Sequence, residues 1–266
     1  MKVALIDNGS LKPAAQACLR AVAASIEESA GTRVMPVSWK HSDRTGAGAW
    51  TLAPWIRSNV SEGEREFVLI PFFISPQGAI GSALRRDLAA LQEETGGFEF
   101  SFAGGLNHSA LATIIADRVR ETAEINGLRR PSVIVVDHGG PSPASAAVRN
   151  RVADSARDLL RGKIGMLAAA SMESPDGEDF AFNRPLFADA LASPGLESND
   201  VVIAPLFLAP GRHAGEDGDL ARIAREAQAS APALRCHFTE LVGTHPSVAP
   251  RLASNLLKAL RVEARP

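Results

Sequence analysis

The sequence predicts an α/β protein made of two homologous flavodoxin-like lobes, each a parallel sheet flanked by helices, with a cleft between them. Short apolar segments alternate with longer amphipathic ones along the 266 residues, which is the pattern of βα units around a parallel sheet. The pattern also occurs twice, and the turn-forming segment "NGLRRP" at 126–131 separates the two copies. We therefore expect lobes at about 1–128 and 129–266.

Each lobe is expected to contain four strands, because its short apolar segments are hydrophobic on both faces and too short for helices. The clearest is "VVIAPLFL" at 201–208, which leads directly into a loop of glycine, arginine, histidine and acids. A last amphipathic segment predicts a helix over about 248–263. The expected strands are 3–6, 33–37, 67–70 and 98–103 in the first lobe, and 132–136, 164–169, 201–204 and 234–241 in the second.

The two halves repeat each other in sequence. The segment "VALIDNGSLKPAAQACLRAVAASI" aligns with "VIVVDHGGPSPASAAVRNRVADSA", and "VLIPFFISPQGAIG" aligns with "VIAPLFLAPGRHAG". A third match sets "GGLNHSALATII" beside "LVGTHPSVAPRL". Three matches in the same order and at nearly constant offset indicate a duplicated α/β unit. They pair Asp7 with Asp137, Pro71 with Pro205, and His108 with His245.

Composition and short motifs exclude several classes of function. The net charge is −2 and the isoelectric point is near 6.3, so neither nucleic acid nor a membrane surface is an expected partner. Cys18 and Cys236 form no CxxC pair, which argues against an iron–sulfur cluster and fits the cytoplasm. The sequence has no P-loop, dinucleotide fingerprint or nucleophile elbow, so neither a bound nucleotide nor serine hydrolase chemistry is expected.

Two histidines distinguish the second half from the first. His138 and His213 each follow a predicted strand, whereas the matching positions of the first half hold Asn8 and Ala79. Ligands of open parallel sheets lie beyond the carboxyl ends of the strands. We therefore expect both imidazoles to face one cleft.

Four motifs follow one another in the second lobe: "DHGG" at 137–140, "SMESP" at 171–175, "PLFLAPGRHAGED" at 205–217 and "LVGTHP" at 241–246. In this order they resemble the class II tetrapyrrole chelatases, in particular the sirohydrochlorin chelatases of the CbiX type. The third motif is specific, whereas "HGG" alone is weak. The resemblance covers the whole second lobe and, more faintly, the first.

The resemblance implies ATP-independent insertion of a divalent ion, cobalt or iron, into sirohydrochlorin or a related tetrapyrrole, in cobalamin or siroheme biosynthesis. By motif, His138, His213 and Glu173 would be the catalytic residues and also the ligands of the metal. Neutral imidazole binds such ions and is a base near physiological pH. Since metallation of the macrocycle removes two pyrrole protons, a site of His and Glu can hold the ion and accept those protons.

A tetrapyrrole of this kind bears many carboxylates, and this slightly acidic chain must hold them with local donors. Arg212 can grip a carboxylate through its guanidinium fork. Glycine-rich turns near helix starts can offer backbone N–H groups to an anion. The expected substrate-binding residues are Gly139, Gly140, Gly211 and Arg212, with Arg149 and Arg184 as further candidates by position alone.

Some features depart from the motifs or leave alternatives open. Gly140 stands where the family has Ser or Thr, so only backbone donors remain there. His41, in "SWKHSD", falls near the position that matches Glu173, and is either a third metal ligand or a loop residue. Glu216 and Asp217 are expected to favour the N-terminal end of the next helix.

A second kind of function is a non-catalytic protein that binds and delivers a metal ion or a tetrapyrrole. The loss of imidazoles from the first half favours this alternative, because duplicated sites can decay. Metal stores usually carry histidine-rich tracts, and this sequence has none. We therefore expect the enzyme, a metal chelatase of the lyase class. The sequence does not fix its metal, its tetrapyrrole or its oligomeric state.

Overall fold

The computed structural model describes residues 1–41, 50–75, 79–193 and 200–263. They form two parallel sheets flanked by helices, which confirms the predicted fold class. The chain divides into two compact units, and each is described by itself. Unit one comprises Met1–Leu106 and Pro246–Pro266, and unit two comprises Asn107–His245.

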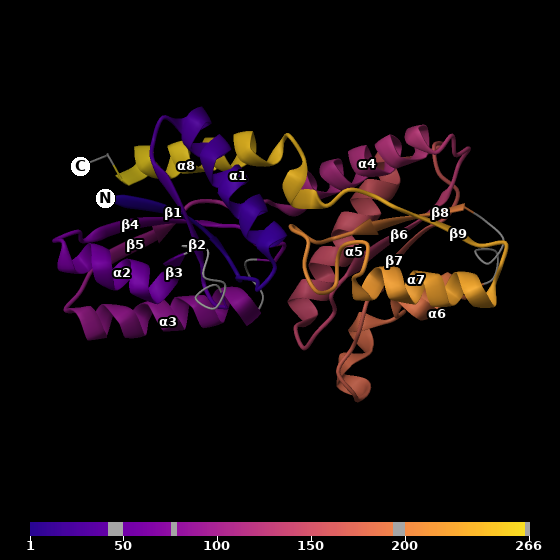
Figure 1. Cartoon of the computed structure of the whole chain (residues 1–266), viewed down its shortest axis with the longest axis horizontal. Helices are drawn as coiled ribbons and strands as arrows, with labels where there is room; N and C mark the ends of the chain where they lie inside the picture. The colour runs from indigo at the N-terminus through magenta and orange to yellow at the C-terminus, as the bar shows by residue number, and fades with distance from the viewer. Residues whose placement is uncertain (42–49, 76–78, 194–199, 264–266) are drawn as a thin grey trace. The chain divides into compact units, whose positions relative to one another are not determined.

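Unit one contains a five-stranded sheet in the order β3-β2-β1-β4-β5, with every neighbouring pair parallel. Figure 1 shows α1 and α8 side by side on one face of this sheet, with α2 and α3 on the other. The strands are β1 (Lys2–Asp7), β2 (Val34–Ser38), β3 (Trp50–Thr51), β4 (Glu66–Pro71) and β5 (Glu99–Phe102). The helices are α1 (Pro13–Ala30), α2 (Leu52–Ser61), α3 (Ala79–Thr95) and α8 (Val248–Glu263).

Unit two contains a four-stranded parallel sheet in the order β7-β6-β8-β9. Helices α4 and α5 cover one face, and α6 and α7 cover the other (Figure 1). The strands are β6 (Ser132–Asp137), β7 (Leu167–Ser171), β8 (Asp200–Pro205) and β9 (Arg235–Phe238). The helices are α4 (His108–Ile125), α5 (Pro143–Leu159), α6 (Phe187–Leu191) and α7 (Asp219–Ser230), with short 3-10 helices η1 (Glu178–Asn183) and η2 (Val242–Thr244).

The two sheets have matching strand orders, since β2-β1-β4-β5 corresponds to β7-β6-β8-β9. The register repeats as well, because Asp7 pairs with Ser38 in unit one and Asp137 pairs with Ser171 in unit two. The sequence analysis missed β3, which is only two residues long. In unit two, the corresponding sheet edge beside β7 has an isolated bridge between Ser171 and Leu186.

The predicted strands are all present, but their ends differ by a few residues. The apolar segment 201–208 continues past its strand, which ends at Pro205. The predicted strand 234–241 is also longer than β9, which ends at Phe238. Leu206, directly after β8, is still buried at 3% exposed, whereas Phe207 and Leu208 are half-buried. Hydrophobicity therefore does not mark the limit of the hydrogen-bonded ladder.

The central strands are apolar because helices cover both of their faces. Residues 3–6 of β1 and 133–136 of β6 are all buried. Glycine turns then lead into the following helices, where Pro13 and Pro143 occupy the first helical turns. Proline fits there because its missing N–H has no intrahelical partner at that position. The carboxyl ends of β1 and β6 therefore lie next to helix starts.

Each compact unit contains one helix that the sequence repeat assigns to the other half of the chain. The repeat places α4 with the first lobe and α8 with the second, at the boundary between 1–128 and 129–266. In the structure, α4 packs against α5 in unit two, and α8 packs against α1 in unit one. The Asn255 side chain of α8 also donates hydrogen bonds of 2.8 and 3.1 Å to the carbonyl oxygens of Gly104 and Gly105. The ends of the sequence repeat are thus not the ends of the compact units.

None of the helices in the described ranges has the length and apolar character that crossing a membrane requires. Neither cysteine forms a disulfide: Cys18 is buried and Cys236 is half-buried. Burial raises the pKa of the Cys236 thiol to about 11. Because the thiolate is the reactive form, this cysteine is kept as a thiol at neutral pH.

Candidate functional site

The turn after β6 places His138 at the carboxyl end of the central strand of unit two. Gly139 adopts a φ of +84°, and a Cβ at this position would collide with the backbone carbonyl of Glu173. The backbone N–H of Glu173 in turn donates to the carbonyl oxygen of His138 at 3.2 Å. A glycine is needed here because no other residue fits the close approach of these two segments. The turn therefore sets His138 beside Glu173.

His213 comes from the loop between β8 and α7. The backbone N–H groups of Asp219 and Leu220 donate to the carbonyl oxygens of Arg212 and His213 at 3.3 and 3.2 Å. These bonds hold the loop against the first turn of α7, which begins at Asp219. The His213 side chain is 24% exposed and is therefore reachable from solvent.

The structure brings together all three residues that were predicted to bind metal. The Nε2 atoms of His138 and His213 are 3.2 Å apart, and the two rings are nearly perpendicular, at 86°. The Oε1 atom of Glu173 is 3.6 Å from Nε2 of His138. An open pocket of about 460 Å³ contains this cluster. Its lining consists of His138, Met172, Glu173, Arg212, His213, Asp219, Arg222 and Ile223.

The contacts of the two Nδ1 atoms indicate which tautomer each neutral imidazole adopts. Nδ1 of His138 lies 3.2 Å from the carbonyl oxygen of Gly139, and Nδ1 of His213 lies 2.7 Å from Oδ2 of Asp219. Both partners only accept hydrogen bonds, so we assign the ring proton to Nδ1 in each case. Both Nε2 atoms are then left without a proton and can bind a cation. The rings meet edge to face with centroids 4.5 Å apart, so small ring rotations are needed to point both lone pairs at one ion.

The spacing of the two Nε2 atoms also suits one shared ion. Two imidazole nitrogens at 2.0 to 2.1 Å from a tetrahedral ion are about 3.3 Å apart, close to the 3.2 Å found between His138 and His213. Across the part of the chain that the structure describes, no group of three or more His, Cys, Asp or Glu side chains forms a complete metal site. Glu173 is 58% exposed, so its side chain has room to move toward the pair.

Asp219 is a candidate site residue that the sequence analysis did not select. The predicted acids, Glu216 and Asp217, precede α7, whereas Asp219 is its first residue and contacts His213. Asp219 lies between two guanidinium groups: Arg212 Nε is 3.9 Å from its Oδ2, and Arg222 Nη2 is 3.9 Å from its Oδ1. A carboxylate behind a metal-binding imidazole fixes the orientation of the ring. The available signal was the acid at the helix start, six residues after His213.

The three glycines predicted to bind substrate do not offer free N–H groups. The N–H of Gly139 donates to the carboxylate of Asp137, and that of Gly140 donates to Oδ1 of Asn183 at 3.3 Å. The N–H of Gly211 donates to the carbonyl oxygen of Ala214 at 2.9 Å. These N–H groups thus have partners within the turns, and the assignment of the three glycines to substrate binding stays a prediction.

The predicted arginines have different environments. Arg212 lines the pocket and is 84% exposed, so its guanidinium is available to an anion. Arg184 is also exposed, but it pairs with Asp189 at 3.5 Å and does not line the pocket. Arg149 is only 1% exposed, which excludes direct contact with a substrate carboxylate. Arg222 lines the pocket although the sequence analysis did not select it.

In the described residues of unit one, the strand ends equivalent to those of His138 and Glu173 carry Asn8 and Lys40. The N–H of Lys40 donates to the carbonyl oxygen of Asn8 at 3.2 Å, as Glu173 does to His138. Lys40, and not His41, is thus the counterpart of Glu173. His41 is exposed and has a φ of +66°. Ala79 is the first residue of α3, and its side chain lies outside the described part of the structure.

A family model named CbiX matches residues 2–122 and 132–259, which lie in both halves of the repeat. The chain resembles the solved structure of SirB from Bacillus subtilis with Fe3+, with a TM-score of 0.72 and 14% identity over 100% of this chain and 98% of that one. It also resembles the sirohydrochlorin chelatase SirB from Bacillus subtilis subspecies spizizenii in complex with cobalt, with a TM-score of 0.69 and 12% identity over 97% and 95% of the two chains.

A third similar structure is CbiX, described as the terminal enzyme for biosynthesis of siroheme in denitrifying bacteria. Its TM-score is 0.65, and the identity is 18% over 97% of this chain and 99% of that one. At such identities, the structural likeness supports the fold alone. A search of the curated proteins found no match.

Proposed function

The chain belongs to the CbiX family, and on that basis we propose that it inserts a divalent metal ion, cobalt or iron, into sirohydrochlorin or a related tetrapyrrole without ATP. Similar structures include a sirohydrochlorin chelatase in complex with cobalt and a SirB with Fe3+. The metallated product would serve cobalamin or siroheme biosynthesis. The metal ion is a substrate in this proposal.

The observation that carries the proposal is the proximity of the Nε2 atoms of His138 and His213, 3.2 Å apart in an open pocket. With both ring protons on Nδ1, each Nε2 atom has a lone pair available to a cation. A divalent ion satisfies both nitrogens at once. The pocket is open, so a tetrapyrrole can reach the ion and take it from the histidines.

The reaction exchanges one ion for two protons. The ion forms bonds to the four ring nitrogens of the tetrapyrrole, and two of these nitrogens lose their protons as the ion enters. We assign His138, His213 and Glu173 to holding the incoming ion. As the ion moves to the macrocycle, Nε2 of His213 and the carboxylate of Glu173 become free to accept the displaced protons. The metal ligands thereby become the bases.

Asp219 supports His213 in both roles. Its carboxylate accepts the Nδ1 proton at 2.7 Å, which leaves Nε2 with a lone pair for the ion. When Nε2 later takes a proton, the same carboxylate stabilises the imidazolium that forms. Arg212 and Arg222 each lie 3.9 Å from an oxygen of the Asp219 carboxylate. The acid is therefore a positioning residue for His213.

Arg212 and Arg222 are the candidate carboxylate-binding residues at this pocket. Both guanidinium groups line it, and their side chains are 84% and 55% exposed. A guanidinium can hold a carboxylate through two parallel hydrogen bonds. The positive charges would orient a polycarboxylate macrocycle with its ring nitrogens toward the histidines.

The direct test is an assay of the purified protein with sirohydrochlorin and either Co²⁺ or Fe²⁺, in the absence of oxygen and of ATP. The expected result is a change in the absorbance of the tetrapyrrole that is faster than the reaction without protein and that repeats over many turnovers. Metallation at the uncatalysed rate with both ions would contradict the proposal.

A non-catalytic carrier is the second candidate, and unit one favours it. Asn8 and Lys40 there occupy the positions of His138 and Glu173, so one of the two copies has already lost the metal-binding groups. A carrier would bind one equivalent of Co²⁺ or of sirohydrochlorin but would not turn over. The assay above therefore separates the two functions.

A further inference from the structure

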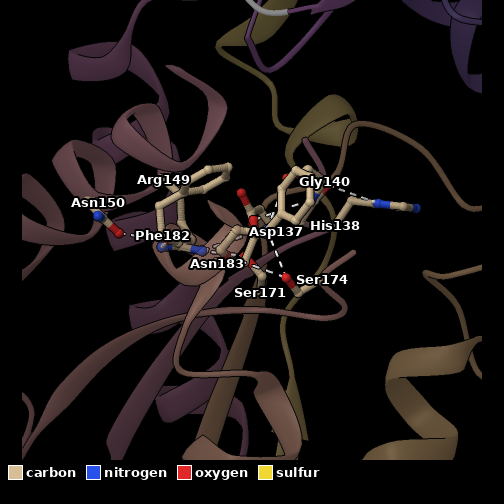
Figure 2. A network of polar contacts seen from close by, with 11 residues as sticks. Asp137, His138, Gly140, Arg149, Asn150, Ser171, Ser174, Phe182 and Asn183 are labelled. Carbon is tan, nitrogen blue, oxygen red and sulfur yellow. Dashed lines mark hydrogen bonds and ion pairs between the residues drawn. The ribbon is translucent and has the colours of Figure 1, made fainter. Parts of the chain in front are cut away.

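A buried arginine lies behind the candidate metal site in unit two. Arg149, on α5, is 1% exposed, and Figure 2 shows its guanidinium surrounded by polar groups from three other segments. Nη1 donates to Oδ1 of Asp137 at 3.4 Å and to Oγ of Ser171, and Nη2 donates to the carbonyl oxygen of Phe182 at 3.0 Å. A buried guanidinium needs such partners, because an unpaired charge in the interior is strongly destabilising.

These contacts join the two segments that carry His138 and Glu173. Asp137 is the last residue of β6 and directly precedes His138, and Ser171 ends β7 two residues before Glu173. Ser171 also donates to Oδ1 of Asp137 at 2.6 Å. One guanidinium therefore holds the ends of both strands in a fixed relation. Small shifts at these strand ends move the His138 and Glu173 side chains directly.

Asn183 extends the same connection. It is 1% exposed and lies next to Phe182, whose carbonyl oxygen accepts from Arg149. Its Nδ2 donates to the carbonyl oxygen of Gly140 at 2.9 Å and to Oγ of Ser174 at 3.2 Å, and its Oδ1 accepts from the N–H of Gly140 at 3.3 Å. The segment after Glu173 is thus bonded to the turn after His138 (Figure 2).

Unit one provides an internal comparison. Asp7 and Ser38 pair there as Asp137 and Ser171 do, and Ser38 likewise donates to the aspartate. The sequence repeat, however, places Leu19 at the position of Arg149, and Leu19 is buried at 4% exposure. The Asp and Ser pair is thus common to both sheets. The arginine occurs only in the unit that carries the two histidines.

From this comparison, we propose that Arg149 is a positioning residue, which with Asn183 fixes His138 and Glu173 at the spacing that binds the metal ion. The proposal rests on the function proposed above for its choice of ligand, a divalent metal ion. The arginine is not needed to build the sheet, because the first sheet forms with a leucine in its place. Its guanidinium instead fixes two strand ends that must act together on one ion.

The test compares Arg149→Leu, which reproduces the arrangement of unit one, with Arg157→Leu on the same helix. The Arg157 side chain is 49% exposed and pairs with Asp154; it also donates to the carbonyl oxygen of Leu167, at the opposite end of β7 from Ser171. Co²⁺ alone is the probe, and its visible absorption spectrum reports both affinity and coordination. We expect Arg149→Leu to weaken Co²⁺ binding about 10- to 100-fold, the range found for residues behind metal ligands, and to alter the spectrum. Arg157→Leu should change neither.

Arg149→Lys and Asn183→Ala keep the proposal open to contradiction if Arg149→Leu does not fold. Lysine retains the charge but cannot reach Asp137, Ser171 and Phe182 together, so affinity should be intermediate. The proposal would be overturned if folded Arg149→Leu bound Co²⁺ within twofold of the wild type and with an unchanged spectrum. If Arg149→Leu does not fold, the same result for Arg149→Lys and Asn183→Ala would overturn it. Because Co²⁺ binding needs no tetrapyrrole, the result stands even if the chelatase assay fails.

Discussion

Oδ2 of Asp219 lies 2.7 Å from Nδ1 of His213, on the opposite side of the ring from the nitrogen that faces His138. The carboxylate therefore controls the imidazole without occupying the pocket position of the ion. Asp217, which the sequence motif selects, is exposed and precedes the helix. The two acids are two residues apart, but we expect only the substitution of Asp219 to impair the site.

Asp219→Ala should weaken Co²⁺ affinity or turnover about 10- to 100-fold, because the ring of His213 loses the acceptor that fixes its proton. Asp217→Ala is the matched control and should behave as the wild type. Co²⁺ titrations and the metallation assay measure both variants. Equal effects of the two substitutions would mean that the contact with His213 is unimportant.

His213→Ala should lower turnover at saturating metal by about 10²- to 10⁴-fold, the usual contribution of a positioned acid or base. The fold should survive, because no large apolar group leaves the core. His237→Ala is the control, since that imidazole pairs with Asp200 at 2.9 Å and does not line the pocket. An alanine variant at 213 that metallates sirohydrochlorin at the wild-type rate would exclude the proposed role.

Gly139→Ala should destabilise unit two more than Gly162→Ala. Both glycines have positive φ, +84° and +78°, but only a Cβ at Gly139 meets backbone, the carbonyl of Glu173. Gly162→Ala should lose only the free energy needed to hold alanine in the left-handed backbone conformation, about 1 to 2 kcal/mol. Urea unfolding and Co²⁺ titration measure the two effects. The expectation fails if both variants lose the same stability and bind Co²⁺ equally well.

Asp7→Asn should remove part of the pH dependence of stability. Burial raises the pKa of Asp7, although hydrogen bonds from Ser38 and from the N–H of Gly9 oppose the shift. The folded state then holds this proton more tightly than the unfolded state, so the free energy of unfolding falls as pH rises through the raised pKa. Asparagine carries no such proton.

Urea unfolding between pH 4 and pH 7 measures this difference. The stability of Asp7→Asn relative to the wild type should increase with pH and level off once Asp7 is fully ionised in both states. A difference that stays constant across this range would show that the charge of Asp7 is not responsible.

The repeat in the sequence was enough to predict the two parallel sheets and the convergence of His138 with His213. Parallel strands end at the same edge of a sheet, so residues that directly follow neighbouring strands lie near each other. These predictions depend only on strand order and on position relative to a strand end. Glu173 was instead selected by the motif resemblance, and the structure places it after β7, next to β6.

The contacts of Asp219, Arg149 and Asn183 could not be predicted in the same way. Arg149 reaches Asp137 across 12 positions and Asn183 reaches Gly140 across 43, so no local spacing identifies the pairs. The partners of the glycine N–H groups could not be predicted for a related reason. A free donor and a donor that is bonded within a turn have the same sequence, and only the folded loop distinguishes them.

The exchange of α4 and α8 has a consequence for the order in which the chain folds during synthesis. All of unit two, 107–245, leaves the ribosome before α8 does, whereas unit one lacks a helix until residues 248–263 have been translated. Until α8 has been translated, residues 1–106 lack the helix that packs against α1. The second unit to be started is therefore the first whose residues are complete, and domains generally fold as units once they are complete.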